Sequence, residues 1–146
     1  MEEIVFNPSE KPTVGVEIEA QLVDKDSGNL VNIAEGIINT YDNDERVKHE
    51  LYLSTVEVTS SPLLDTNETY KELATILSKV LEIASENNAG LISTGAHPFA
   101  MYEDQVITDV NPRYQEFADK YGWAVRRQLA FGMRVHVGMD SKEKAI

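Results

Sequence analysis

The sequence predicts an α+β domain, in which an antiparallel or mixed sheet has a polar, concave face and helices pack on its other face. Three observations predict this class: two segments alternate apolar and polar residues as half-buried strands do, a third such segment lies near the C-terminus, and a long amphipathic helix lies between them. The length of 146 residues is that of one ordinary domain. We therefore expect a single domain over residues 1–146.

The composition narrows the possible functions. A hydrophobic share of 42% with 26% charged residues is typical of a folded chain. The 13 Lys and Arg against 25 Asp and Glu give a formal net charge of −12, so we expect no nucleic-acid partner. We see no membrane span and no signal peptide, and we expect a cytoplasmic protein. The absence of cysteine leaves oxygen or imidazole as ligands for any metal.

The first strand is predicted over residues 13–24, TVGVEIEAQLVD. One face carries Val14, Val16, Ile18, Ala20 and Leu22, and the other carries Glu17, Glu19 and Gln21. Turn residues at 25–30 then favour a hairpin, in which residues 31–32 begin a short return strand. Residues 33–42 are predicted to form a short helix.

The second strand and the long helix follow in residues 51–86. Val56 and Val58 alternate with Thr55, Glu57 and Thr59, and Pro62 ends the strand. Asp65 is predicted to cap the helix, with Glu68 at the capping-box position three residues later. The apolar stripe of this helix consists of Tyr70, Leu73, Ile76, Leu77, Val80, Leu81 and Ala84. We expect the stripe to cover the sheet.

The C-terminal half predicts two more strands and a helix. Residues 91–98 read as a strand, and residues 102–111 as a polar loop. Asn111 and Pro112 predict the cap and first position of a helix. Its buried side would be lined by Tyr114, Phe117, Tyr121 and either Trp123 or Val125. The third polar-faced strand is MRVHVGM, residues 133–139, and residues 140–146 begin like a further helix.

The polar strand faces admit two interpretations. Alternate residues of a strand are roughly 6.6 Å apart, so Glu17 and Glu19 could each serve neighbouring ions, with Glu57 and His136 brought in from paired strands. Crowded carboxylates must be solvated, protonated or neutralised, and Mg²⁺ or Mn²⁺ prefers such oxygen ligands. The same residues could instead form the wet face of an antiparallel sheet. The pattern alone does not decide between the two.

Four motifs in order resemble the N-terminal portion of the glutamate-cysteine ligase type 2 family, also called carboxylate-amine ligases. They are TVGVEIEAQLVD, VKHELYLSTVEVTSSP, GAHPFA and FGMRVHVGM. The resemblance spans nearly the whole chain and implies part of a glutamine-synthetase-like catalytic sheet, from the N-terminal part of a longer ligase domain. It implies ATP and Mg²⁺ or Mn²⁺ as cofactors. The substrates implied are glutamate or a similar carboxylate, which is phosphorylated, and an amine such as cysteine, which displaces the phosphate without a protein nucleophile.

The resemblance also assigns site residues. It implies metal ligands at Glu17, Glu19, Glu50, Glu57 and His136, and cofactor contacts at Arg134 and His136. Glu50 is an odd number of residues from Glu57, so a bend or bulge near Tyr52 is required to bring both to one face. The family often reads His-Val-His-Val-Gly in the last motif, and this chain has Arg134 in place of the first histidine.

Two functional hypotheses follow. The first is an ATP-dependent ligase that is present only in part, for which we expect negligible turnover by the 146-residue chain alone. The second is a non-catalytic nucleotide-binding, metal-binding or assembly module that keeps the ligase sheet. An incomplete sheet exposes edges that must be covered, so we also expect a homo-oligomer.

Overall fold

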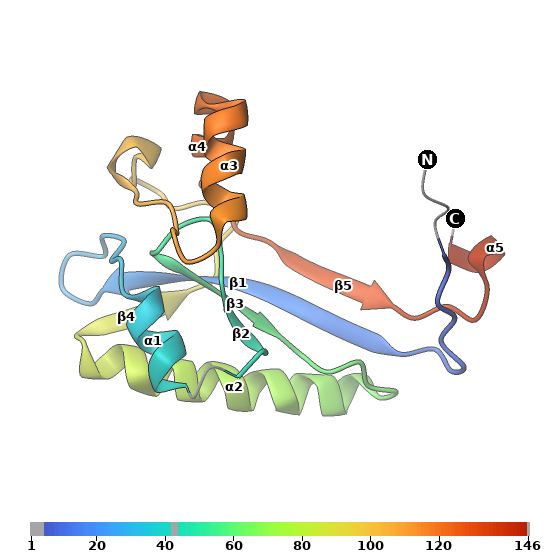
Figure 1. Cartoon of the computed structure of the whole chain (residues 1–146). Coiled ribbons are helices and arrows are strands. Elements are labelled where there is room, and N and C mark those ends of the chain that lie inside the picture. The colour runs from blue at the N-terminus through green and yellow to red at the C-terminus, as the bar shows by residue number, and fades with distance from the viewer. Residues whose placement is uncertain (1–4, 42–43, 146) are drawn as a thin grey trace.

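A computed structural model describes residues 5–41 and 44–145, which fold around one five-stranded sheet (Figure 1). Its strands are β1 (Val14–Asp24), β2 (Val47–His49), β3 (Thr55–Thr59), β4 (Ala89–Ile92) and β5 (Met133–Val137). β1 is central: β3 pairs along one edge, with β2 outside it, and β4 and β5 share the other edge. All four pairings are antiparallel, which confirms the predicted class.

The register of the sheet brings the charged side chains to one face. Directly paired residues of antiparallel strands point to the same side of the sheet. Glu19 pairs with Glu57 of β3, and Glu17 pairs with Arg134 of β5. Lys48 of β2 lies opposite Glu57. The alternation in the sequence therefore becomes a continuous polar face across four strands.

Two helices cover the apolar face and build the core. They are α1 (Ala34–Thr40) and α2 (Thr66–Glu86), which lie below the sheet in Figure 1. From α2, Leu73, Ile76 and Val80 are buried against Val56 and Val58 of β3. Burial of each such side chain contributes roughly 1.5–3 kcal/mol. The predicted helix at 33–42 is thus confirmed as α1, which is shorter because Ile33 and Tyr41 are its caps, and residue 42 lies outside the described residues.

The remaining helices do not join this layer. The short 3₁₀ helix η1 (Tyr102–Asp104) precedes α3 (Pro112–Tyr121) and α4 (Trp123–Arg126), which stand on the polar side of the sheet in Figure 1, and α5 (Lys142–Ala145) follows β5. Asn111 caps α3 as predicted, because its side chain accepts a hydrogen bond from the Arg113 amide at 3.0 Å. A second small core of Tyr52, Ile107 and Ala118 holds this part to the sheet.

Several predicted details are corrected by the structure. Residues 31–32 form no return strand, and only a single bridge joins Val23 to Leu30. The strand predicted at 91–98 runs instead over Ala89–Ile92, and β2 was not predicted. In the long helix, Tyr70 and Leu81 are exposed instead of buried. Near α3, Phe117 and Tyr121 are exposed instead of buried, and of the two alternatives Trp123 and Val125 it is Val125 that is buried.

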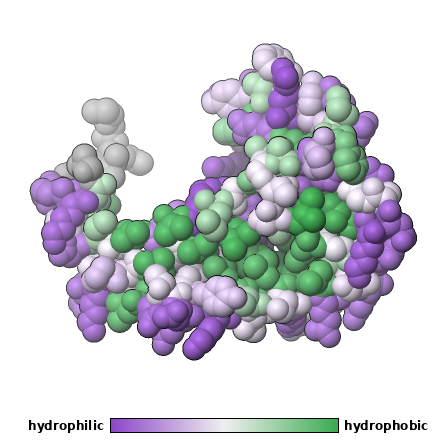
Figure 2. All heavy atoms as spheres, turned by 180° about the vertical axis from the view of Figure 1, so that it is seen from behind, coloured by the Kyte–Doolittle hydropathy of each residue, from purple (hydrophilic) through white to green (hydrophobic). Residues whose placement is uncertain are grey.

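The apolar face continues beyond the helices that cover it. β5 alternates as predicted, but Met133, Val135 and Val137 are each more than half exposed. Met133 and Val135, together with α2, line an open groove of about 730 Å³, and Figure 2 shows apolar side chains gathered over this face. Among the described helices, none is long and apolar enough to cross a membrane.

Candidate functional site

The candidate site lies on the polar face, where a bend brings Glu50 beside the strand glutamates. β2 ends at His49 and β3 begins at Thr55, so the segment between them leaves the ladder. Thr108 holds this segment, since its hydroxyl donates to the Glu50 carbonyl at 2.7 Å and its amide donates to the Leu51 carbonyl at 2.9 Å. The bend that the sequence required near Tyr52 is therefore present.

Three of the predicted metal ligands converge. One carboxylate oxygen from each of Glu19, Glu50 and Glu57 lies within 4.8 Å of the other two. These residues come from β1, the bend and β3, so the cluster depends on the fold. The other two predicted ligands are not in this group: Glu17 and His136 form a neighbouring pair, with Glu17 Oε2 3.2 Å from His136 Nε2.

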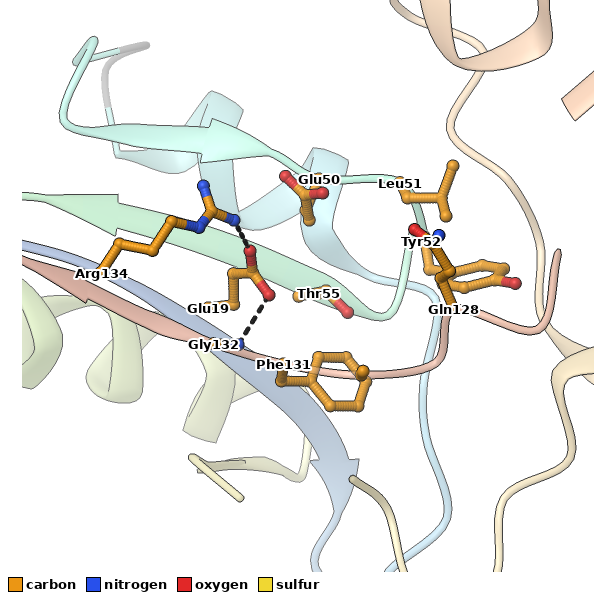
Figure 3. Close-up of a pocket in the computed structure, with 10 residues that line it drawn as sticks. Glu19, Glu50, Leu51, Tyr52, Thr55, Gln128, Phe131, Gly132 and Arg134 are labelled. Carbon is orange, nitrogen blue, oxygen red and sulfur yellow. Dashed lines mark hydrogen bonds and ion pairs between the residues drawn. The ribbon is translucent and has the colours of Figure 1, made fainter. Parts of the chain in front are cut away.

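Arg134 lies between the two groups of acids. Its Nη1 donates to Glu17 Oε2 at 3.0 Å and lies 3.9 Å from Glu57 Oε2, while its Nη2 donates to Glu19 Oε1. The other Glu19 oxygen accepts a hydrogen bond from the Gly132 amide at 2.8 Å. Figure 3 shows both interactions of Glu19. The guanidinium thus neutralises much of the charge that the sheet register brings together.

The pKa values of the carboxylates differ because their neighbours differ. Burial raises the pKa of Glu50, and the charges of Glu19 and Glu57 raise it further. Burial also raises the pKa of Glu57. For Glu17, burial acts in the same direction but is outweighed by the His136 hydrogen bond and by the charges of His136 and Arg134, so its pKa is lowered. Glu50 and Glu57 are therefore the two carboxylates for which burial outweighs the nearby positive charges, although Lys48 lies 3.8 Å from Glu57.

A cavity of about 370 Å³ opens beside the cluster. Glu19, Glu50, Thr55, Phe131 and Arg134 contribute to its wall (Figure 3). Thr55 is buried on the polar face of β3, and its hydroxyl has no hydrogen-bond partner among the described residues. A buried, unpaired hydroxyl is rare in a folded protein unless water or a ligand satisfies it.

Helix α3 overhangs the other side of the cluster. A second cavity of about 360 Å³ lies between Tyr114, Arg113 and Phe117 on the helix and Glu50 and Glu57 on the sheet side. The Tyr114 hydroxyl donates to the His49 carbonyl at 3.2 Å. Burial, together with the nearby Glu50 charge, raises the pKa of Tyr114 to about 12, so this hydroxyl stays protonated.

Sequence reasoning did not assign several residues of this site. Thr55 carried a signal, because it lies on the same predicted polar face as Glu57. Gln128, Phe131 and Gly132 carried none, since they lie in an irregular segment before β5. The GAHPFA motif plays a supporting part at some distance from the cluster: His97 is buried, and its Nε2 lies 2.9 Å from the Gly28 carbonyl.

Comparison with known proteins decides the family. The profile of Glutamate-cysteine ligase family 2 (GCS2) matches residues 13–146. This chain belongs to glutamate-cysteine ligase family 2. A Mycolicibacterium vanbaalenii protein named as a glutamate–cysteine ligase 2-1 is 38% identical over 143 residues, which are 98% of this chain and 37% of the relative. A Leifsonia xyli protein named as a glutamate–cysteine ligase 2 is 35% identical over 151 residues, covering 100% of this chain and 40% of the relative.

A solved structure supports the same fold. The crystal structure of glutamate–cysteine ligase from Francisella tularensis in complex with AMP aligns with a TM-score of 0.71 at 16% identity, covering 91% of this chain and 28% of the ligase. At that identity the likeness shows the fold alone. The chain thus spans 37–40% of the length of the two sequence relatives above and a smaller share of the solved ligase.

The donor set fits the divalent cation that the resemblance implies. Glu19, Glu50 and Glu57 offer only carboxylate oxygens, the ligands that Mg²⁺ and Mn²⁺ prefer. The pKa values of Glu50 and Glu57 are raised because burial disfavours their ionised forms, and a bound cation would stabilise those forms. On β5, Arg134 contacts Glu19 of this cluster, whereas His136 contacts Glu17 beside it.

Proposed function

We propose that this chain supplies the metal-binding wall of an ATP-dependent carboxylate-amine ligase, corresponding to the N-terminal part of a longer catalytic domain. The observation that carries the proposal is the convergence of Glu19, Glu50 and Glu57 from three separate elements in a chain of this family. The carboxylate substrate would be glutamate or a close analogue, and the amine would be cysteine or another amine. The bond would form through an acyl phosphate.

The residues of this chain have defined parts in that proposal. Glu19, Glu50 and Glu57 would hold Mg²⁺ or Mn²⁺, and the ion would neutralise the negative charge of the phosphates during phosphoryl transfer. Arg134 and His136 would orient the ATP phosphates from β5. The unpaired hydroxyl of Thr55, at the cavity wall, would form a hydrogen bond with bound substrate or water. No nucleophilic side chain is needed, since the carboxylate substrate attacks the phosphate.

A second candidate function has an observation of its own. The Arg134 guanidinium contacts Glu19 and Glu57, two of the carboxylates that a cation would use. This contact favours a non-catalytic module that binds nucleotide or metal, or that assembles with other chains, without turnover.

Calorimetry with MnCl₂ and with MnATP separates these functions from a merely solvated face. We expect the wild type to bind Mn²⁺ and Glu19→Gln combined with Glu57→Gln to weaken binding at least about tenfold, because two of three ligands lose their charge. Glu82→Gln is the matched control, since Glu82 is exposed on α2. Equal binding by wild type and the double variant, or no binding by the wild type, would remove the metal assignment.

Turnover tests whether this chain alone builds a complete active site. For the 146-residue chain with glutamate, cysteine and MgATP we expect no measurable phosphate release, because positioning of reactants is worth roughly 7–11 kcal/mol and relatives use a much longer chain. Phosphate release that requires both glutamate and an amine would instead show that the chain builds a complete site.

A further inference from the structure

Arg134 makes contacts that a bound cation would also need. Its guanidinium donates to Glu17 and Glu19, and it lies 3.9 Å from Glu57. Two of these three acids belong to the converging cluster, and Glu50 is the cluster member without an ion pair to any described residue. Arg134 therefore contacts three of the four acids on this face, while Lys48 lies 3.8 Å from Glu57 on the far side of β3 from β1.

The guanidinium and a divalent cation compete for the same carboxylates. Each Glu19 oxygen already accepts one hydrogen bond, from Arg134 or from the Gly132 amide, so a metal must use a remaining lone pair close to the positive guanidinium. The Arg134 side chain is 52% exposed. It can therefore swing into solvent without opening the hydrophobic core.

We propose that Arg134 is a built-in counter-ion that competes with the divalent cation for Glu19 and Glu57, and so sets the metal affinity of the face. This inference rests on the metal-binding role proposed above. Without metal, the guanidinium holds the carboxylates together against their mutual repulsion. With metal, Arg134 is released from Glu19 and becomes available to a phosphate. The guanidinium and the metal ion repel each other at the shared carboxylates, so each weakens the binding of the other.

The test compares Arg134→Gln with the wild type, using Mn²⁺ alone as the probe. In EDTA, Arg134→Gln should melt at a lower temperature than the wild type, because the acids lose their counter-ion. Added Mn²⁺ should restore its Tm and should shift the wild-type Tm much less. By calorimetry, Mn²⁺ should bind Arg134→Gln at least about tenfold more tightly than the wild type. Arg134→His provides a second variant, which also removes the guanidinium but adds an imidazole that can bind Mn²⁺ directly.

Arg46→Gln is the matched control. Arg46 also bridges two acids, with Nη2 2.6 Å from Asp44 and Nη1 3.0 Å from Glu72, but these lie outside the metal cluster. We expect its Tm to fall in EDTA and to stay low when Mn²⁺ is added. A fall in Arg134→Gln that Mn²⁺ likewise fails to restore would make Arg134 an ordinary structural ion pair and overturn the inference.

Two further outcomes separate this inference from the proposed function. Equal Mn²⁺ affinity in wild type, Arg134→Gln and Arg134→His, with binding still lost on Glu19→Gln combined with Glu57→Gln, would overturn competition by Arg134 and leave the metal site intact. Absence of Mn²⁺ binding in the wild type and in both Arg134 variants would overturn the metal site itself, and the competition with it.

Discussion

Glu50 shows how the surroundings of one residue set its contribution to stability. Burial raises its pKa, and Glu19 and Glu57 raise it further. When the pKa of a carboxyl is higher in the folded than in the unfolded chain, its protonated form stabilises the fold. This stabilisation is fully present below the unfolded pKa of about 4.3, and it is lost as the pH rises through the folded pKa. At neutral pH and without metal, the ionised Glu50 therefore destabilises the fold.

Glu50→Gln should consequently raise the Tm in EDTA at pH 7.5. We expect a rise of roughly 2–4 °C, the shift that about 1 kcal/mol causes in a domain near this size. At pH 4 the difference from wild type should vanish, because the wild-type carboxyl is then protonated. Scanning fluorimetry at both pH values measures this, with Glu82→Gln on α2 as the control. A lower Tm at pH 7.5 would mean that the Glu50 charge is fully compensated in the folded chain.

At the scale of elements, helix α2 begins with a simpler cap than its sequence predicts. Asp65 and Glu68 have capping-box spacing, yet the contact that forms is a single hydrogen bond from the Asn67 amide to Asp65 Oδ1 at 2.6 Å. Because α2 covers the apolar face, its first turn also supports the strands that carry the site.

Asp65→Ala should lower the free energy of unfolding by about 1 kcal/mol, whereas Glu68→Ala should lower it by only a few tenths of a kcal/mol. Both substitutions remove one negative charge at the helix N-terminus, so their difference reports the capping hydrogen bond. Urea unfolding followed by circular dichroism measures both values. Equal losses would indicate that charge alone, and not the hydrogen bond, stabilises this end of α2.

The elements with long periodic patterns could be predicted, and the short or irregular ones could not. β1 and α2 each repeat their period several times, so Glu17, Glu19 and the buried Leu73 were placed correctly. β2 has three residues, too few for a period. Within the site, the sequence predicted that Glu50 needs a bend, but Thr108, which holds that bend, is distant in sequence and gives no local signal.

The errors in burial have a common cause at the same scale. Apolar spacing shows which face of a helix is apolar, but not whether anything packs on it. In α3, Ala118 is buried against Tyr52, whereas Phe117 and Tyr121 project past this small contact and stay exposed. On α2, Tyr70 and Leu81 line the open groove instead of the core.

At the scale of the whole molecule, the two sides of the sheet differ in chemistry and in completeness. The polar face carries the paired charges, while the apolar face is covered by α1 and α2 but open between α2 and β5. Among the described residues, β5 pairs only with β1, so its other edge is free. An exposed edge beside an apolar groove is a surface that favours association.

We therefore predict that the 146-residue chain associates with a second copy of itself through β5 and the groove. A two-fold axis would cover both grooves at once, because each copy offers the same apolar residues, among them Tyr70, Met133 and Val135. Sedimentation velocity should show a dimer or larger species that dissociates on dilution. Val135→Lys should shift the chain to monomer, since it places a charge at the centre of the contact.

Val110→Lys is the control for this prediction, because Val110 is also exposed and adds the same charge away from the groove. It should leave the association unchanged. A wild type that remains monomeric at every concentration would contradict self-association. In that case the groove would instead be covered by the additional ligase sequence that the relatives possess. Adding that sequence should then slow hydrogen–deuterium exchange of the Val135 amide.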